Sequence, residues 1–171
     1  MSVDEKLDTG FMRQALAVAA EGLAKGELPI GAVVVAEGRV IASAYTQEKS
    51  QGRLLVHADL LAIEAADRIR PFPGKRRDAT LYVNLEPCLM CLGAAMTAFI
   101  GRVCYGLESP ADGAVSMVQN WKRAEADMPS YRVPAIKGGI LREETIRLMR
   151  EYVVLHPTGP ITDWARTLIP S

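Results

Sequence analysis

The sequence has few of the residues that cross-link secreted proteins and no long hydrophobic run. It contains three cysteines in 171 residues, which argues against a disulfide framework. No apolar run reaches the roughly eighteen residues of a membrane helix, and no basic segment leads into an apolar stretch near the start. We therefore expect no membrane span and no signal peptide, and we predict a cytoplasmic protein whose thiols stay reduced.

The chain also lacks a surplus of either charge, because 20 lysines and arginines balance 20 acidic residues. Since nucleic-acid affinity depends on basic side chains at phosphates, this balance makes tRNA the less favoured partner. The run Lys75-Arg76-Arg77 is either a local basic patch or a solvated loop. With 49% hydrophobic residues, residues 1–171 are predicted to form one domain, with its core at about 11–155 and a tail or short helix at 156–171.

Two short segments carry residues suited to metal chemistry. His57 precedes one apolar helical pattern, and Cys88 and Cys91 open another, directly after Pro87. Cysteines three positions apart at a helix start lie on one face and can reach a common metal. Catalytic zinc uses three nitrogen or sulfur ligands and leaves a fourth position for water. A Cys-x-x-Cys pair alone could be a redox pair or two core thiols, but together with His57 it predicts a Zn²⁺ site.

Hydrophobic periodicity predicts strands that alternate with helices. This alternation favours parallel crossovers, with sites at the carboxyl ends of the strands. Residues 1–10 are expected to be frayed, 45–55 to be a polar loop, and 108–139 to be functional or to hold short elements. Cys104, within a predicted strand, is expected to be a buried, inert thiol. The predicted helices cover 11–25, 58 to 68 or 70, 88–99, 141–155 and 161–169, and the predicted strands cover 31–36, 39–44, 80–84 and 102–107.

The two metal segments resemble a known signature. His57-Ala58-Asp59 and Pro87-Cys88-Leu89-Met90-Cys91 are similar to the His-x-Glu and Pro-Cys-x-x-Cys motifs of the zinc-dependent nucleobase deaminases. Segments 27–35, 80–88 and 100–106 look like strands of the bacterial tRNA adenosine deaminases and the related guanine and cytosine deaminases. The resemblance runs from about Phe11 to Tyr152. It implies a three-layer α/β/α cytidine deaminase-like fold with a mixed sheet of about five strands, a bound Zn²⁺ and a homodimer.

Position 59 departs from that signature. The resemblance implies that Asp59 stands where the family has the glutamate that shuttles protons. Its side chain is shorter by one carbon–carbon bond, about 1.5 Å, and misplacement on this scale can cost about a hundredfold in rate. Three readings of Asp59 follow. It is active because the pocket or an intervening water brings the substrate within reach, it is active but slow, or the site has lost catalysis. Glu64 is too far along the helix to replace it.

The resemblance also suggests substrate contacts. The family commonly has an asparagine after the second strand, where this chain has Thr46, which is otherwise a simple loop hydroxyl. Glu86, just before the cysteine motif, is expected to orient backbone groups. Trp121 is either a pocket wall or lid, or an anchor of its loop. The predicted substrate contacts are Thr46, Ala58, Asn84, Glu86, Pro87 and Trp121.

The predicted function is hydrolytic removal of an exocyclic amine from a nucleobase, nucleoside or related small heterocycle. Zinc makes hydroxide available near neutral pH, and a carboxyl beside it can move the protons. The stretch from Glu151 to Pro157 is apolar, where the tRNA enzymes that the chain resembles carry a basic helical tail. Wobble adenosine deamination in tRNA is the alternative, and a catalytically silent zinc-binding fold is another. The tail with Trp164 either contributes to a neighbouring subunit's pocket or packs on its own core.

Overall fold

A computed structural model describes residues 2–69, 76–121 and 132–170. The elements in chain order are α1 (Val3–Ala24), β1 (Gly31–Ala36), β2 (Arg39–Tyr45), α2 (Glu48–Gln51), α3 (Ala58–Ile69), β3 (Thr80–Leu85), α4 (Leu89–Thr97), β4 (Arg102–Leu107), α5 (Val115–Gln119), β5 (Ala135–Lys137), α6 (Arg142–Leu155) and α7 (Pro160–Thr167). The five strands form one mixed sheet in the order β2-β1-β3-β4-β5. β1 runs antiparallel to β2 and β3, whereas β3, β4 and β5 are parallel.

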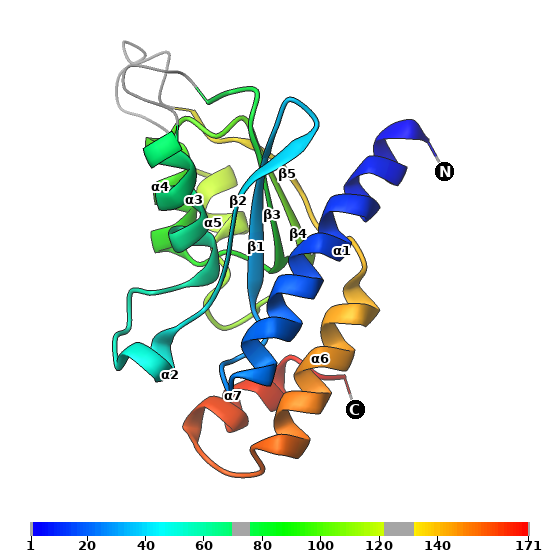
Figure 1. The fold of residues 1–171 in the computed structure, drawn as a ribbon, viewed down its shortest axis with the longest axis vertical. Helices are drawn as coiled ribbons and strands as arrows, with labels where there is room; N and C mark the ends of the chain where they lie inside the picture. The colour runs from blue at the N-terminus through cyan, green and yellow to red at the C-terminus, as the bar shows by residue number, and fades with distance from the viewer. Residues whose placement is uncertain (1, 70–75, 122–131, 171) are drawn as a thin grey trace.

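The sheet lies between two helical layers, with α1 and α6 on one face and α3, α4 and α5 on the other (Figure 1). Successive side chains of β1 pack alternately against the two helical layers. Val33 and Val35 pack in one cluster with Met12, and Ala32 and Val34 pack in another with Ala62. Because both faces are covered, all six residues of β1 are buried, which explains its unbroken apolar run. The predicted three-layer α/β/α fold with a five-stranded mixed sheet is confirmed.

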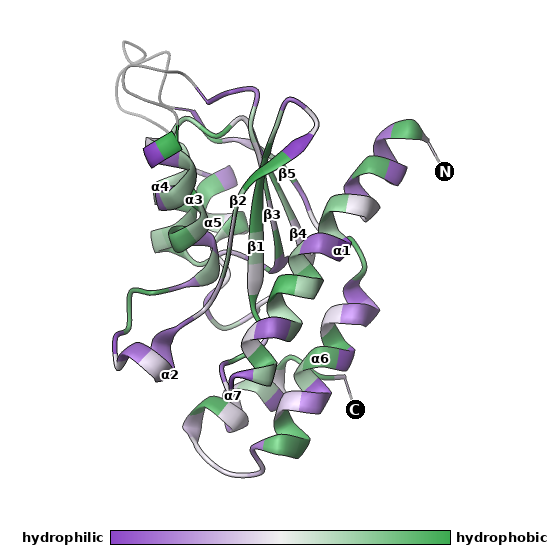
Figure 2. Cartoon of the chain, viewed as in Figure 1, coloured by the Kyte–Doolittle hydropathy of each residue, from purple (hydrophilic) through white to green (hydrophobic). Residues whose placement is uncertain are grey.

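Hydropathy follows this layering. Figure 2 shows hydrophobic residues along β1 and hydrophilic ones on α2. Helix α1 packs tightly against Gly31 of β1, where a Cβ atom would lie 2.3 Å from the backbone nitrogen of Ala19 and 2.4 Å from the carbonyl oxygen of Ala15. Glycine is therefore required at the start of this strand.

The N-terminal residues correct one prediction. Helix α1 begins at Val3, so the expectation that residues 1–10 are frayed is wrong for residues 3–10. Ser2 and Glu5 form a capping box, in which the Glu5 N–H donates to Ser2 Oγ and the Ser2 N–H donates to the Glu5 carboxylate. Asp8 is buried and ion-paired further along the helix. The apolar periodicity missed this part because polar contacts stabilise it.

Three segments without clear periodicity contain short or buried structure. Residues 45–55 include α2, and 108–139 include α5 and β5, while 122–131 lie outside the described residues. In the basic run, Lys75 also lies outside them. Arg76 is 6% exposed and pairs with Asp67, so it belongs neither to a basic patch nor to a solvated loop. Among the described helices, none is long and apolar enough to cross a membrane.

Candidate active site

The three predicted zinc ligands lie at the N-termini of two helices. His57 directly precedes α3, and its carbonyl oxygen accepts the Leu61 N–H at 3.0 Å. Cys88 is the N-cap of α4, where its carbonyl accepts the Leu92 N–H at 3.0 Å, and Cys91 lies in the first turn. Helix N-termini carry partial positive charge, which favours the thiolate form of cysteine.

The ligand atoms have the spacing that zinc requires. His57 Nδ1 lies 3.7 Å from Cys88 Sγ and 3.7 Å from Cys91 Sγ. All three atoms lie within 4.8 Å of one another. Tetrahedral zinc, with bonds of about 2.1 Å to nitrogen and 2.3 Å to sulfur, separates these atom types by about 3.6 Å. The two nitrogen–sulfur separations therefore match those around a zinc ion.

The three side chains also shift one another's protonation. A hydrogen bond with Cys91 and the contact with His57 lower the pKa of Cys88 to about 4, although burial opposes the shift. The pKa of Cys91 is raised by that hydrogen bond and by burial. The Cys88 interaction raises the pKa of His57 to about 9, against burial. Zinc binds thiolates and neutral imidazole, so its binding at this site would displace protons from Cys91 and His57.

Asp59 is buried beside the predicted ligands, in the first turn of α3. It is 4% exposed, and its Oδ1 accepts the Leu60 N–H at 3.1 Å. Burial raises its pKa, although hydrogen bonding to Cys91 opposes the shift. A carboxyl whose protonated form is favoured is suited to hold and return a proton during a reaction.

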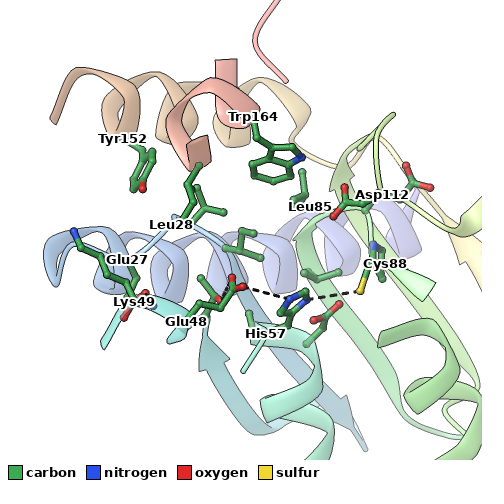
Figure 3. A pocket seen from close by; sticks show the side chains of 18 of the residues that line it. Glu27, Leu28, Glu48, Lys49, His57, Leu85, Cys88, Asp112, Tyr152 and Trp164 are labelled. Carbon is green, nitrogen blue, oxygen red and sulfur yellow. Dashed lines mark hydrogen bonds and ion pairs between the residues drawn. The ribbon is translucent and has the colours of Figure 1, made fainter. Parts of the chain in front are cut away.

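A cavity of about 340 Å³ opens over His57 and Cys88 (Figure 3). Trp164 of α7 and Tyr152 of α6 project into it from the side opposite His57 (Figure 3). Helix α2 supplies Glu48 and Lys49. The lining residues are Glu27, Leu28, Ile30, Thr46, Glu48, Lys49, His57, Ala58, Asp59, Val83, Leu85, Glu86, Pro87, Cys88, Asp112, Tyr152, Pro160, Ile161 and Trp164.

Four of the six predicted substrate contacts, Thr46, Ala58, Glu86 and Pro87, line this cavity. Glu86 also orients backbone as expected, because its carboxylate accepts the N–H groups of Ser109 at 3.0 Å and Val115 at 3.1 Å. These bonds hold the segment before α5 next to the cysteine loop.

The other two predicted contacts, Asn84 and Trp121, are not among the residues that line this cavity. The side chain of Asn84 is fully buried, where it donates to the Pro29 carbonyl and accepts the Gly31 N–H, each at 2.9 Å. It therefore joins β3 to β1. Trp121 follows α5 and is 44% exposed. The tryptophan that does line the cavity is Trp164.

Sequence patterns missed Glu48, Tyr152 and Asp112. Glu48 lies in the segment expected to be a polar loop, and its Oε1 is 3.7 Å from His57 Nε2. The available signal was its position, two residues beyond Thr46. Tyr152 lies within the predicted helix 141–155 and Asp112 in a segment without clear periodicity, so neither carries a signal of its own.

Comparison with known proteins agrees with this geometry. Residues 5–107 match the cytidine and deoxycytidylate deaminase zinc-binding region. The chain belongs to this family. It is a zinc-dependent hydrolytic deaminase, as the motifs predict.

Two relatives differ in the share of their length that the chain covers. The tRNA-specific adenosine deaminase of Bacillus subtilis is 34% identical over 137 residues, which cover 80% of this chain and 83% of that protein. The tRNA(Ile)-lysidine synthase of Deinococcus radiodurans is 38% identical over 143 residues, 82% of this chain. The chain spans only 23% of that longer protein.

Solved structures share the fold. A structure from a study of A-to-I editing by tRNA:A34 deaminases has a TM-score of 0.67 and 33% identity, and the match covers 82% of this chain and 99% of that one. The guanine deaminase from Nitrosomonas europaea has a TM-score of 0.65 at 22% identity, over 85% of this chain and 84% of that one, and supports the fold alone.

Proposed function

We propose that this deaminase acts on a small amino-substituted heterocycle, as a free base or nucleoside. Zinc would be held by His57, Cys88 and Cys91, with Asp59 as the proton shuttle. The observation that carries the proposal is the cavity itself, which joins two of the three ligands and a buried carboxyl to an aromatic wall formed by Tyr152 and Trp164. Bound zinc supplies a hydroxide nucleophile near pH 7.

The residues of the chain would provide the proton transfers. Water adds to the ring carbon that bears the amine, and the carbon–nitrogen bond breaks to release ammonia and leave a carbonyl. The Asp59 carboxylate takes one proton from the water and delivers it to a ring nitrogen. It then takes the second proton from the newly added hydroxyl and delivers it to the departing amine. Burial supports this role, because it disfavours the charged carboxylate and raises the pKa of Asp59, so the side chain takes up a proton more readily.

The charges around the cavity favour a small substrate over a polyanion. Glu48 and Asp112 line it, and Lys49 is the one lysine or arginine among the described lining residues. Tight tRNA binding needs several basic contacts to phosphate. The aromatic side chain of Trp164 suits a flat heterocycle, because an aromatic ring can stack on it whatever substituents that ring carries.

A second candidate, deamination of adenosine at the tRNA wobble position, is supported by the Bacillus subtilis relative and by the structure from the A34 study. An ammonia-release screen separates the two. It compares aminopurines, aminopyrimidines and aminotriazines with tRNA anticodon stem-loops at two salt concentrations. We expect turnover of a small molecule. Inosine formation in the stem-loop, without small-molecule turnover, would establish the tRNA reading. No ammonia from any compound, with zinc bound, would favour the catalytically silent fold.

We also propose that the protein is a cytoplasmic homodimer. The resemblance to the deaminases supports this, as do the exposed apolar side chains Leu54, Leu89 and Met117. Because the mass of one chain is 18.6 kDa, light scattering should give twice that value. The mass of a single chain would contradict the dimer.

A further inference from the structure

The second ring nitrogen of His57 faces a carboxylate that belongs to neither zinc motif. Glu48 Oε1 lies 3.7 Å from His57 Nε2 (Figure 3). The other nitrogen, Nδ1, faces the sulfur atoms of Cys88 and Cys91. A neutral imidazole has one N–H, so a ring that binds metal through Nδ1 carries its proton on Nε2. In that tautomer the N–H stands on the nitrogen that lies 3.7 Å from Glu48 Oε1.

We propose that Glu48 is a positioning residue for His57, whose carboxylate accepts the Nε2–H and holds Nδ1 towards the two cysteines. Metal-binding histidines generally donate their second N–H to a carboxylate, a carbonyl or water, which fixes both tautomer and ring orientation. The present separation is about 0.7 Å longer than a typical N–H···O bond, so the proposal requires the glutamate side chain to shift towards the ring by that amount. The proposal rests on the assignment of His57 as a zinc ligand.

Buried contacts fix the backbone of Glu48. Glu27 is 2% exposed, and its carboxylate accepts the N–H groups of Lys49 at 3.0 Å and Ser50 at 2.7 Å. These bonds satisfy two of the free N–H groups at the start of α2. A helix of only four residues is thereby held against the cavity.

A second set of contacts joins the loop before Glu48 to the segment before His57. The Gln47 N–H donates to the Val56 carbonyl at 3.0 Å. Thr46 Oγ1 lies 3.1 Å from Glu48 Oε2 and 3.3 Å from the same Val56 carbonyl. Thr46 is 1% exposed, so its hydroxyl is committed to these partners. Thr46 therefore helps to orient the carboxylate that faces His57.

Zinc affinity, measured by competition between the holoenzyme and a chromophoric chelator, tests the role of Glu48. Glu48→Ala should weaken zinc binding about 10- to 100-fold, the usual effect of losing such a partner. Glu48→Gln keeps an oxygen acceptor and the shape of the side chain, so it should lose less affinity than Glu48→Ala. Glu64→Ala is the matched control, because it removes one negative charge from a side chain that pairs with Arg68 on α3 and is not among the lining residues of the cavity. It should bind zinc like the unmodified protein.

The comparison with His57→Ala separates this proposal from the ligand assignment. If His57→Ala retains full zinc affinity, the ligand assignment fails. If His57→Ala loses zinc while Glu48→Ala binds it normally, the ligand set stands and the positioning role is overturned. Equal weakening by Glu64→Ala would also overturn it, because the effect would then be one of general charge. Thermal unfolding in excess chelator should be the same for Glu48→Ala and the unmodified protein, and a lower metal-free Tm would indicate a structural role instead.

Discussion

Asp8 and Arg102, ninety-four residues apart in the chain, form a two-pronged ion pair that fastens α1 to the first residue of β4. Two further donors reach the same carboxylate, Tyr82 Oη and Lys137 Nζ, each at 2.9 Å. The carboxylate of Asp8 is buried, whereas Arg102 and Lys137 reach solvent. The zinc motif lies at the other end of the sheet, beyond the carboxyl end of β3. The ion pair therefore stabilises the fold without touching the site.

This cluster makes stability depend on pH. Hydrogen bonds from Arg102 lower the pKa of Asp8 well below its usual range, although burial opposes the shift. Because the pKa in the folded state is lower than the unfolded value of about 3.9, the contribution is complete above that value and is lost as the pH falls through the folded one. Asp8→Asn should cost about 1.5–3 kcal/mol at pH 7, the scale of hydrogen bonds to a charged group.

Urea unfolding at pH 7, 5, 4 and 3 measures this contribution. The gap in stability between the unmodified protein and Asp8→Asn should be largest at pH 7 and should shrink below pH 4. Asp4→Asn, on an exposed part of the same helix, is the control and should show a small, nearly constant difference. A gap that does not change with pH would show that Asp8 acts by shape and not by charge.

Cys88→Ala tests the metal centre. The variant removes one of three ligand atoms, so it should lose stoichiometric zinc, measured by metal analysis after dialysis. Cys104→Ala is the matched control. Cys104 is fully buried within β4 and lies outside the ligand group, and burial raises the pKa of its thiol to about 12. Full zinc content in Cys88→Ala would remove Cys88 from the ligand set.

Asp59→Asn tests the proton shuttle. The amide keeps the shape of the side chain but cannot exchange a proton, so the variant should bind zinc and lose turnover by about 10²-fold or more. Asp59→Glu is the sharper probe. The cavity wall is packed around the shorter acid, which is 4% exposed, so lengthening it should also reduce activity on the native substrate. Undiminished turnover in Asp59→Asn would place the proton transfer elsewhere.

The sequence was informative wherever one strong local pattern decided the structure. Strand β4 has the predicted bounds. The His57 and cysteine segments were predicted to meet because each lies at the start of a helix at the same edge of the sheet, and the structure brings them together. The sequence was uninformative where polar contacts between distant residues determine the position of a side chain. Asn84 lies near the carboxyl end of a strand, a position that suggests a substrate contact. Its side-chain amide is instead hydrogen-bonded to the backbone of Pro29 and Gly31. Glu27 binds the backbone of the two residues that follow Glu48, and Glu48 faces His57. No short motif encodes such contacts.

Trp164→Ala tests whether the C-terminal helix α7 belongs to the substrate site. Trp164 projects into the cavity opposite His57 (Figure 3), whereas Ala165 and Leu168 are buried in a cluster with Ile146 and Met149 of α6. Deleting residues 157–171 would remove both the ring and this packing, so a loss of stability would accompany any loss of binding. The point variant separates the two effects. Losing one stacking partner costs about 1–3 kcal/mol, so KM should rise about 5- to 150-fold while the zinc content stays unchanged. Trp164→Phe should recover part of the loss, and Trp121→Ala, outside the cavity, should leave KM unchanged. If Trp164→Ala lowers Tm but leaves KM unchanged, α7 supports the fold only, and the aromatic wall is not part of substrate binding.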